Sequence, residues 1–238
     1  MTERAEATVI IAAYNPRLDW LLGAVDSAQA QTVPVEIVVV DDGSDTPVVD
    51  LPDGVRLVRH EKNLGIAAAY NTGIRLMTTP YFVRLDQDDI PAPEKIEVQL
   101  AALHAFGASC CCHSFYALDA NDNSYAIIRP PPLWFTDWRK ALCQWCCFGS
   151  STPMIARTAL EAVKIEEGVY FDPGFHYGQD WELWLRLAAR YEWIYIDTPL
   201  SARREQDTLT SRIQADPQLH ARKLIEDIRI CAKYGSAS

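Results

Sequence analysis

The chain has 238 residues, of which 49% are hydrophobic, so one large domain with a sizeable core is expected. It carries 32 acidic and 22 basic residues, and the formal net charge of −10 argues against binding nucleic acid or an anionic membrane through bulk electrostatics. A negatively charged substrate is still compatible, because a metal ion or an arginine reverses the field locally. No apolar run reaches the ~18 residues of a membrane span, and the charged amino terminus lacks the apolar core of a signal peptide.

Five of the seven cysteines stand in adjacent positions rather than spaced apart, in the segments 110–112 and 146–147. Adjacent residues of a strand point to opposite faces, so these runs do not predict a disulfide framework. Cys143 and Cys146 have C-x-x-C spacing, but the sequence has no second such pair to complete a zinc site. We therefore expect reduced, half-buried cysteines in a cytoplasmic protein.

The first hundred residues alternate strand and helix patterns. Strands are expected in 7–15, 35–45, 54–61 and 81–89, and helices in 18–31, 63–77 and 92–107. The last helix has Pro93 near its first turn and Gly107 just past its end. The strands are continuously apolar, which predicts an α/β fold with a mostly parallel sheet covered by helices on both faces.

The second half of the chain is less regular. We expect a strand pair in 108–130, a strand and short helix in 150–163, a helix and short strand in 177–197, and a helix in 216–235. Asp216 is the expected N-cap of that last helix, with Pro217 at its first position. No repeat or linker divides the chain, which predicts a single domain with three parts: a nucleotide-binding half (7–106), an acceptor and catalytic half (107–212) and a C-terminal helix (213–238).

Polar clusters follow three of the expected parallel strands, at 12–15, 41–45 and 86–89. In such sheets ligands bind outside the carboxyl ends of the strands, so the clusters are expected to share one crevice. Converging carboxylates repel each other unless a cation lies among them, and oxygen ligands select Mg²⁺ or Mn²⁺. Asp86 and Asp88 form a D-x-D pair suited to a metal–diphosphate, whereas we attribute Asp89 to an acidic helix start.

Five segments, in order, resemble family 2 glycosyltransferases with the GT-A fold: "VIIAAYNP", "VVVDDGSD", "NLGIAAAYNTGI", "RLDQDD" and "YGQDWELWLRLA". The resemblance covers about residues 7–212. It implies a Rossmann-like GT-A core and an inverting, metal-dependent transfer of a sugar from a nucleotide-diphosphate donor. Polysaccharide or glycan assembly is the usual setting of the family.

The resemblance also implies roles for individual residues. Asp180 is the expected general base on the acceptor hydroxyl, and Asp88 is the expected ligand of the Mn²⁺ or Mg²⁺ that bridges the diphosphate. One of Asp41 and Asp42, with Asp42 favoured, is expected to accept a hydrogen bond from N3–H of uracil or thymine. The nucleotide is expected to lie against Ala12, Ala13, Tyr14, Asn15, Asn63, Gly65 and Asn71, with Asp86 facing the ribose or the metal.

Some of these residues also fit plain structural roles. Asn71 could bond backbone within its own helix, Tyr14 and Trp181 could belong to the core, and Asp180 could be a helix N-terminal acid. Trp184 lies among leucines and is expected to be buried.

The chain departs from the family pattern at Glu205, which stands where many members carry a metal-binding histidine. Because a carboxylate also ligates these metals, we assign Glu205 as a second metal ligand, and the basic pair before it could face the diphosphate. The segment 203–211 is expected to close over the donor.

The partners expected from the resemblance are a UDP- or dTDP-sugar donor and a glycan or lipid-linked acceptor. Peripheral association with a cytoplasmic membrane face is compatible with the sequence. The main alternative is a catalytically inactive sugar-nucleotide-binding or scaffold domain. A sugar-phosphate nucleotidyltransferase ranks lower because the segment after the first strand has no glycine-rich phosphate loop, and a D-x-D phosphatase lacks its downstream lysine and acidic pair.

Overall fold

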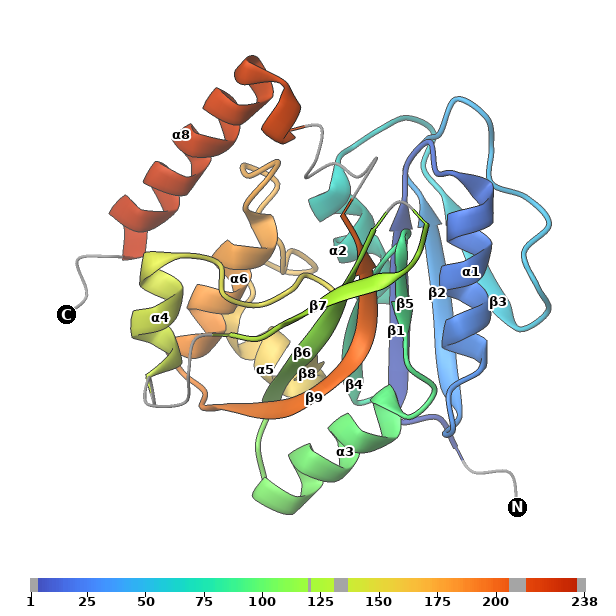
Figure 1. Cartoon of the computed structure of the whole chain (residues 1–238), viewed down its shortest axis with the longest axis horizontal. Helices are drawn as coiled ribbons and strands as arrows, with labels where there is room; N and C mark the ends of the chain where they lie inside the picture. Colours follow the sequence, from blue (N-terminus) through green and yellow to red (C-terminus); the bar gives the residue numbers. More distant parts are fainter. Residues whose placement is uncertain (1–3, 120, 131–136, 206–212, 235–238) are drawn as a thin grey trace.

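The computed structural model describes residues 4–119, 121–130, 137–205 and 213–234. They form one nine-stranded sheet flanked by helices (Figure 1). The strand order is β3-β2-β1-β4-β8-β6-β9-β5, and β7 pairs with β6 outside this path. The α/β class with helices on both faces is therefore confirmed.

The first half of the sheet is parallel, as predicted. β1 pairs with both β2 and β4, and β2 pairs with β3. Its elements are β1 (Ala7–Ala13), α1 (Leu18–Gln29), β2 (Val35–Asp41), β3 (Val55–Arg59), α2 (Ile66–Leu76), β4 (Tyr81–Asp86) and α3 (Lys95–Phe106). Gly107 ends α3 in the left-handed conformation, at φ 60°, which fits the predicted helix stop.

The second half mixes parallel and antiparallel pairs. β6 runs antiparallel to β7 and β8 but parallel to β9. Its elements are β5 (Asp89–Pro91), β6 (Cys110–Leu118), β7 (Ser124–Ile128), α4 (Trp138–Gln144), β8 (Met154–Ala156), α5 (Arg157–Val163), α6 (Gln179–Ala188), β9 (Trp193–Arg204) and α8 (Pro217–Tyr234). The sequence did not predict β5 or α4, and the predicted short strand after α6 is instead a twelve-residue strand.

Two apolar cores lie on the two faces of the sheet. Side chains of α1 and α3 pack on one face, and those of α2, α5 and α6 pack on the other. Cys110 and Cys112 belong to the second core and Cys111 to the first, so adjacent cysteines do point to opposite faces. The described cysteines are all free, but these three are fully buried rather than half-buried.

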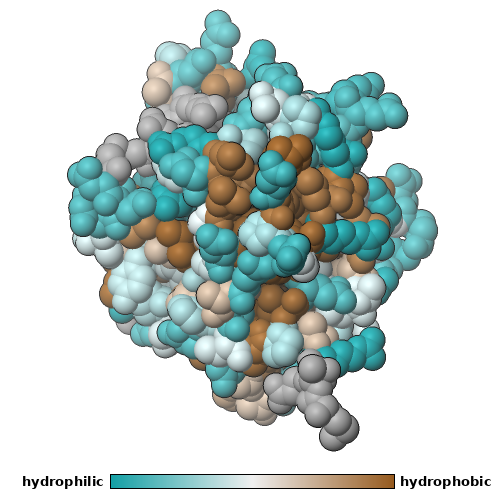
Figure 2. All heavy atoms as spheres, turned by 90° about the vertical axis from the view of Figure 1, so that its right-hand side faces the viewer, coloured by the Kyte–Doolittle hydropathy of each residue, from teal (hydrophilic) through white to brown (hydrophobic). Residues whose placement is uncertain are grey.

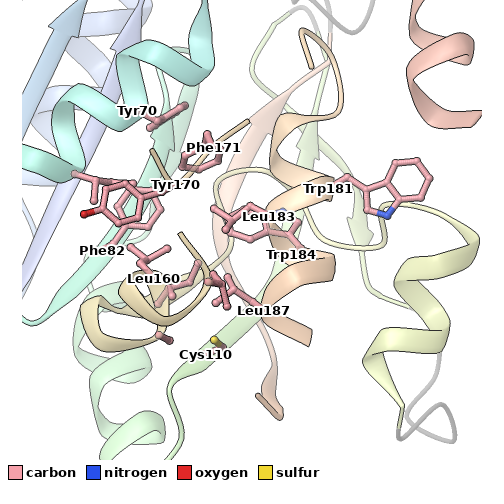
Figure 3. Packing of buried hydrophobic residues seen from close by; sticks show 14 of the residues in the cluster. Tyr70, Phe82, Cys110, Leu160, Tyr170, Phe171, Trp181, Leu183, Trp184 and Leu187 are labelled. Atoms are coloured by element: carbon pink, nitrogen blue, oxygen red, sulfur yellow. The ribbon is translucent and has the colours of Figure 1, made fainter. Parts of the chain in front are cut away.

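Aromatic side chains fill the core beneath the carboxyl end of β4 (Figure 3). The rings of Tyr70 and Phe171 lie 5.3 Å apart, and Trp184 packs edge-on against Phe171. Trp184 is fully buried, as predicted. Trp181 points away from this group toward α4, where its indole N–H donates to the carbonyl of Leu142, so it is a core residue.

The C-terminal helix α8 has the predicted cap, because the Asp216 carboxylate accepts a hydrogen bond from the main-chain N–H of Gln218. Across the described residues, no helix is long and apolar enough to cross a membrane. Apolar side chains gather on the molecular face that carries α1 and β3 (Figure 2). Leu57 on β3 and Val49 in the preceding loop are among the exposed apolar residues.

Candidate active site

The carboxyl ends of three neighbouring strands meet at one edge of the sheet. In the strand register Ala13 of β1 pairs with Asp41 of β2, and Ala12 of β1 pairs with Asp86 of β4. The segments that follow these residues carry the three polar clusters of the sequence. The prediction that they share one edge is therefore confirmed.

Asp41 organises its own loop. Its fully buried carboxylate accepts main-chain hydrogen bonds from Ser44, at 2.9 Å, and Val48, at 3.1 Å, and forms an ion pair with Arg59. Burial alone would raise the pKa of Asp41, but the hydrogen bonds from Ser44, Val48 and Arg59 outweigh burial and lower it. Of the two adjacent aspartates, Asp41 therefore holds its own loop together, because protein groups contact both of its carboxylate oxygens.

Asp42 anchors the segment before α2. Its Oδ1 atom accepts from His60 Nδ1 at 2.7 Å and from the Leu64 N–H at 2.9 Å, and its Oδ2 atom accepts from the Gly65 N–H at 2.8 Å. A carboxylate offers about four acceptor positions, so Oδ2 retains one. Gly65 has φ 93°, a conformation that favours glycine, and Asn63 Oδ1 also accepts from its N–H.

The loops after β1 and β2 are fastened together. Asn15 has φ 44°, and its side-chain amide both donates to and accepts from Asp45, at 2.9 and 2.8 Å. Gly43 packs so closely on the next loop that a Cβ there would lie 2.3 Å from the carbonyl carbon of Lys62. Tyr14 is 44% exposed, so the interpretation of Tyr14 as a core residue is wrong, and its side chain is available to a ligand.

Asn71 is not placed to contact a nucleotide. It is 4% exposed, and its amide group donates to the carbonyl of Phe171 while accepting from the N–H groups of Tyr170 and Phe171. It does not bond backbone within its own helix either. Asn71 instead ties α2 to the segment that precedes α6, and we leave it out of the nucleotide site.

Asp86 is held by several groups. Arg84 contacts Asp86 Oδ1 with Nε at 3.0 Å and Nη2 at 2.9 Å, and the Tyr70 hydroxyl donates to the same oxygen at 2.9 Å. The hydroxyl of Ser150 donates to Oδ2, and the main-chain N–H of Asp86 donates to Ser151 Oγ. Burial would raise the pKa of Asp86, but Arg84, Ser150 and Tyr70 together lower it.

Asp180 reaches the same place from a distant segment. It lies in the first turn of α6, and its Oδ2 atom is 3.5 Å from Arg84 Nη1. Its Oδ1 atom accepts from the N–H of the next residue, Trp181. Asp180 is thus not only a helix-start acid, because one guanidinium lies between it and Asp86.

Asp88 lies in the turn between β4 and β5. Burial and the charge of Asp86 raise the pKa of Asp88 to about 6, while Arg203 and Arg204 act in the opposite direction. Asp89 is not at a helix start, because it is a buried residue of β5 paired with Arg203 of β9. Beneath this turn the ammonium group of fully buried Lys95 donates to the Ser151 carbonyl.

Glu205 lies just after the end of β9. Its exposed carboxylate accepts a hydrogen bond from the hydroxyl of Tyr125 on β7. Arg204 is engaged by Asp122, at 2.7 and 2.9 Å, and by the carbonyl of Asp88, so it does not face an open site. Of the segment 203–211, residues 206–211 lie outside the described residues.

The expected metal ligands Asp88 and Glu205 are not gathered with other ligating side chains in the described residues. Within the described parts of the chain, no three His, Cys, Asp or Glu side chains are grouped to hold an ion by themselves. Two other acidic residues of this half of the chain are engaged by neighbouring groups. The buried Glu182 carboxylate is occupied by Arg186, Lys233 and Tyr234, and Asp172 accepts from the Gly174 N–H.

Four residues of this site were not predicted from the sequence: Arg84, Tyr70, Ser150 and Ser151. A charged residue within the apolar strand 81–86 was the available signal for Arg84. The two serines carried no comparable signal, because their segment is far from β4 in sequence and only the β4–β8 pairing brings it there.

Comparisons with known proteins agree with this geometry. The family model for glycosyl transferase family 2 matches residues 8–163. An uncharacterized glycosyltransferase of Rickettsia bellii is 32% identical over 80% of this chain and 28% of its own length. The succinoglycan biosynthesis protein ExoO of Rhizobium meliloti is 30% identical over 75% of this chain and 54% of its own length. Several of the curated relatives are much longer, and the chain spans about a third of some of them.

Solved structures show the same fold. Residues 1–349 of S. aureus TarS in complex with UDP align with a TM-score of 0.69 at 14% identity, covering 96% of this chain and 65% of that chain. The same protein in complex with UDP-GlcNAc aligns with a TM-score of 0.67 at 13% identity, covering 96% of this chain and 71% of that chain. The fold is that of the GT-A glycosyltransferases. Because the family model covers more than half of the residues, the chain belongs to glycosyl transferase family 2.

Proposed function

We propose that this chain transfers a sugar from a nucleotide-diphosphate donor to a hydroxyl of a glycan or lipid-linked acceptor, with inversion at the anomeric carbon. UDP- or dTDP-sugars are the favoured donors. Family membership supports the reaction class. The single observation that carries the proposal is the convergence of Asp180 from α6 and Asp86 from β4 on one buried guanidinium.

The donor nucleotide is assigned to the carboxyl ends of β1 and β2. Asp42 supplies a rigid acceptor, since its carboxylate is fixed by two main-chain N–H groups and one Oδ2 position remains for the N3–H of a pyrimidine. Tyr14 is exposed at the same edge, where Ala12 and Ala13 end β1 and Asn15 begins the loop after it. Asn63 and Gly65 border the nucleotide from the segment before α2. Crystals of TarS contain UDP and UDP-GlcNAc, which is consistent with a uridine donor.

We assign a hard divalent cation to the turn after β4, where Asp88 offers one carboxylate. Its carboxylate lies near Asp86, whose charge helps to raise its pKa to about 6, so a cation between the two carboxylates relieves a repulsion. Mg²⁺ and Mn²⁺ take one or two protein carboxylates and complete their shell with water and phosphate oxygens. When bound, such an ion stabilises the charge on the departing diphosphate. Asp88 is the assigned ligand, and Glu205 is a second ligand only if it leaves Tyr125.

Asp180 carries the acid–base step. Its carboxylate takes the proton from the acceptor hydroxyl as the oxygen attacks the anomeric carbon. The new glycosidic bond forms on the face opposite the departing diphosphate, whose bond to the anomeric carbon breaks with its electron pair. A single displacement of this kind inverts the anomeric configuration.

The proposal is tested with a panel of UDP-glucose, UDP-galactose, UDP-GlcNAc, dTDP-glucose, GDP-mannose and ADP-glucose, each with Mn²⁺ or Mg²⁺. A binding module and an enzyme both gain thermal stability from the correct nucleotide. Only an enzyme also releases the nucleoside diphosphate as the sugar is transferred to water. We expect metal-dependent release from at least one uridine or thymidine donor. Stabilisation without release from any donor would favour the inactive binding domain.

A further inference from the structure

Arg84 is a buried cation placed between two carboxylates of the candidate site. It lies on β4, only 3% of its side chain is exposed, and its guanidinium carbon lies 4.6 Å from the centre of the Tyr70 ring. Burial opposes its charge, but Asp86, Tyr70 and Asp180 outweigh burial and raise its pKa above the ordinary arginine value. Arg84 therefore stays charged across the working range of pH.

The two carboxylates depend on Arg84 to different degrees. Asp86 is also held by Tyr70, by Ser150 and, through its main-chain N–H, by Ser151. The Asp180 carboxylate has, among the described residues, only the N–H of Trp181 besides Arg84. Loss of Arg84 would leave Asp86 supported but would remove the one cation that pairs with Asp180 within the described parts of the chain.

The guanidinium also has an unused donor on the Asp180 side. Nε and Nη2 are both directed at Asp86 Oδ1, at 3.0 and 2.9 Å. Nη1 is buried and makes no hydrogen bond within the described residues, and Asp180 Oδ2 lies 3.5 Å from it. A flat guanidinium can serve both carboxylates at once, whereas the single ammonium of lysine is a point charge without this fork.

We propose that Arg84 is a positioning residue for the transfer reaction: it fixes the Asp180 carboxylate relative to the donor that Asp86 faces. This inference rests on the proposed function, since it takes Asp180 as the base. The competing view is that Arg84 only neutralises buried charge and supports the fold. Arg186 has this role for the buried Glu182, four residues before it on α6.

The experiment compares Arg84→Lys with Arg186→Lys, which changes the same chemical group in a structural ion pair. The probe is the best UDP- or dTDP-sugar of the donor panel with Mn²⁺, with water as acceptor. Single-turnover and steady-state release of the nucleoside diphosphate give kcat, and calorimetric titration with UDP and Mn²⁺ gives the donor-side Kd. Should Arg84→Lys not fold, Arg84→Gln takes its place, because it retains a planar N–H donor.

For Arg84→Lys we expect kcat to fall by about 10 to 10² fold, the effect of a misplaced catalytic group, while Kd for UDP stays within about threefold. For Arg186→Lys we expect a lower melting temperature and an unchanged kcat. Ser150→Ala, which removes one hydrogen bond to Asp86, is expected to weaken donor binding more than it lowers kcat.

A double-mutant cycle with Asp180→Asn separates the inference from the proposed function. If Arg84 acts through Asp180, Arg84→Lys lowers the residual rate of Asp180→Asn by less than about threefold. Equal losses in both backgrounds, a Kd that changes in step with kcat, or an unchanged kcat would each overturn the role of Arg84 while Asp180 remains the base. An Asp180→Asn variant with full activity would instead overturn the proposed base and this inference together.

Discussion

Asp180 and Asp86 face each other across a single guanidinium, although one begins α6 and the other ends β4. Arg84 lies between the two carboxylates, and its charge lowers the pKa of Asp86 against the effect of burial. The pairing also separates the proposed roles: Asp86 lies at the edge of the sheet to which we assign the donor, and Asp180 lies on a helix from the other half of the chain.

Nucleotide selectivity is expected to follow from Asp42. Its remaining acceptor position on Oδ2 suits the N3–H donor of uracil or thymine. Adenine offers no donor at the equivalent ring nitrogen, and guanine presents its N1–H on a larger bicyclic base. In a thermal-shift assay with Mn²⁺, UDP and dTDP should stabilise the protein more than ADP or GDP at equal concentrations. A ligand at 100 times its Kd adds about 2.7 kcal/mol to the free energy of unfolding. Equal or larger shifts with a purine diphosphate would contradict the role of Asp42.

Removal of the charge at Asp88 tests the metal site. Asp88→Asn keeps the shape of the side chain but removes an anionic ligand, so metal-dependent UDP binding and nucleotide release should both fall severely. Binding of UDP without metal should change little and serves as the control. Full activity of the unmodified protein in excess EDTA would show that the reaction needs no divalent ion at Asp88.

The role of Glu205 is tested by comparing variants of Glu205 with a variant of Tyr125, whose hydroxyl donates to it. If Glu205 stands in for a metal-binding histidine, Glu205→Ala should raise the Mn²⁺ concentration needed for half-maximal donor binding, and Glu205→His should restore it. Tyr125→Phe is the control, because it breaks the observed hydrogen bond and leaves the carboxylate in place. An alanine variant with an unchanged Mn²⁺ requirement would make Glu205 a surface residue.

The fully buried Glu182 is expected to govern acid stability. Burial alone would raise its pKa, but Arg186, Tyr234 and Lys233 outweigh burial and lower it. The native state then binds fewer protons than the unfolded state, so this contribution is present above pH ~4.3 and is lost as the pH falls through the lowered pKa.

Glu182→Gln should therefore flatten the acid limb of the stability curve, measured by urea unfolding at several pH values. It should also cost about 3 kcal/mol near neutral pH, because the largely buried Arg186 loses its anion. Asp19→Asn, in the exposed pair with Arg17, is the matched control and should leave stability nearly unchanged. An acid limb of unchanged slope in Glu182→Gln would assign the effect to other carboxylates.

The sequence predicted the first half of the fold well because its signals are local. Continuous apolar strands ending in Asp41 and Asp86 specify parallel strands, and their register then places the polar clusters together. β9 was underestimated because its middle carries Pro199 and polar residues, and its pairing with both β6 and β5 depends on tertiary structure. The short helix α4 has too few residues for a clear helical period.

The sequence predicted the acidic residues of the candidate site but not the side chains that bind and orient them. Asp86 and Asp180 stand in recognisable motifs, whereas the position of Arg84 between them exists only after α6 has packed beside β4. Asn71 was misassigned because a small amide on a helix gives no sign that it will bind the backbone of residues 170–171. Such contacts between distant segments have no local signal in the sequence.

Asp180→Asn tests the central claim most directly. Asparagine keeps the size of the side chain, and its Oδ1 atom can still accept from the N–H of Trp181, so folding and donor binding should be close to normal. It cannot accept the acceptor proton, and transfer at saturating donor should fall by on the order of 10² to 10⁴ fold. We predict this loss of kcat with an unchanged Kd for UDP and an unchanged melting curve. A folded Asp180→Asn variant that retains nearly full transfer would contradict the assignment of Asp180 as the base.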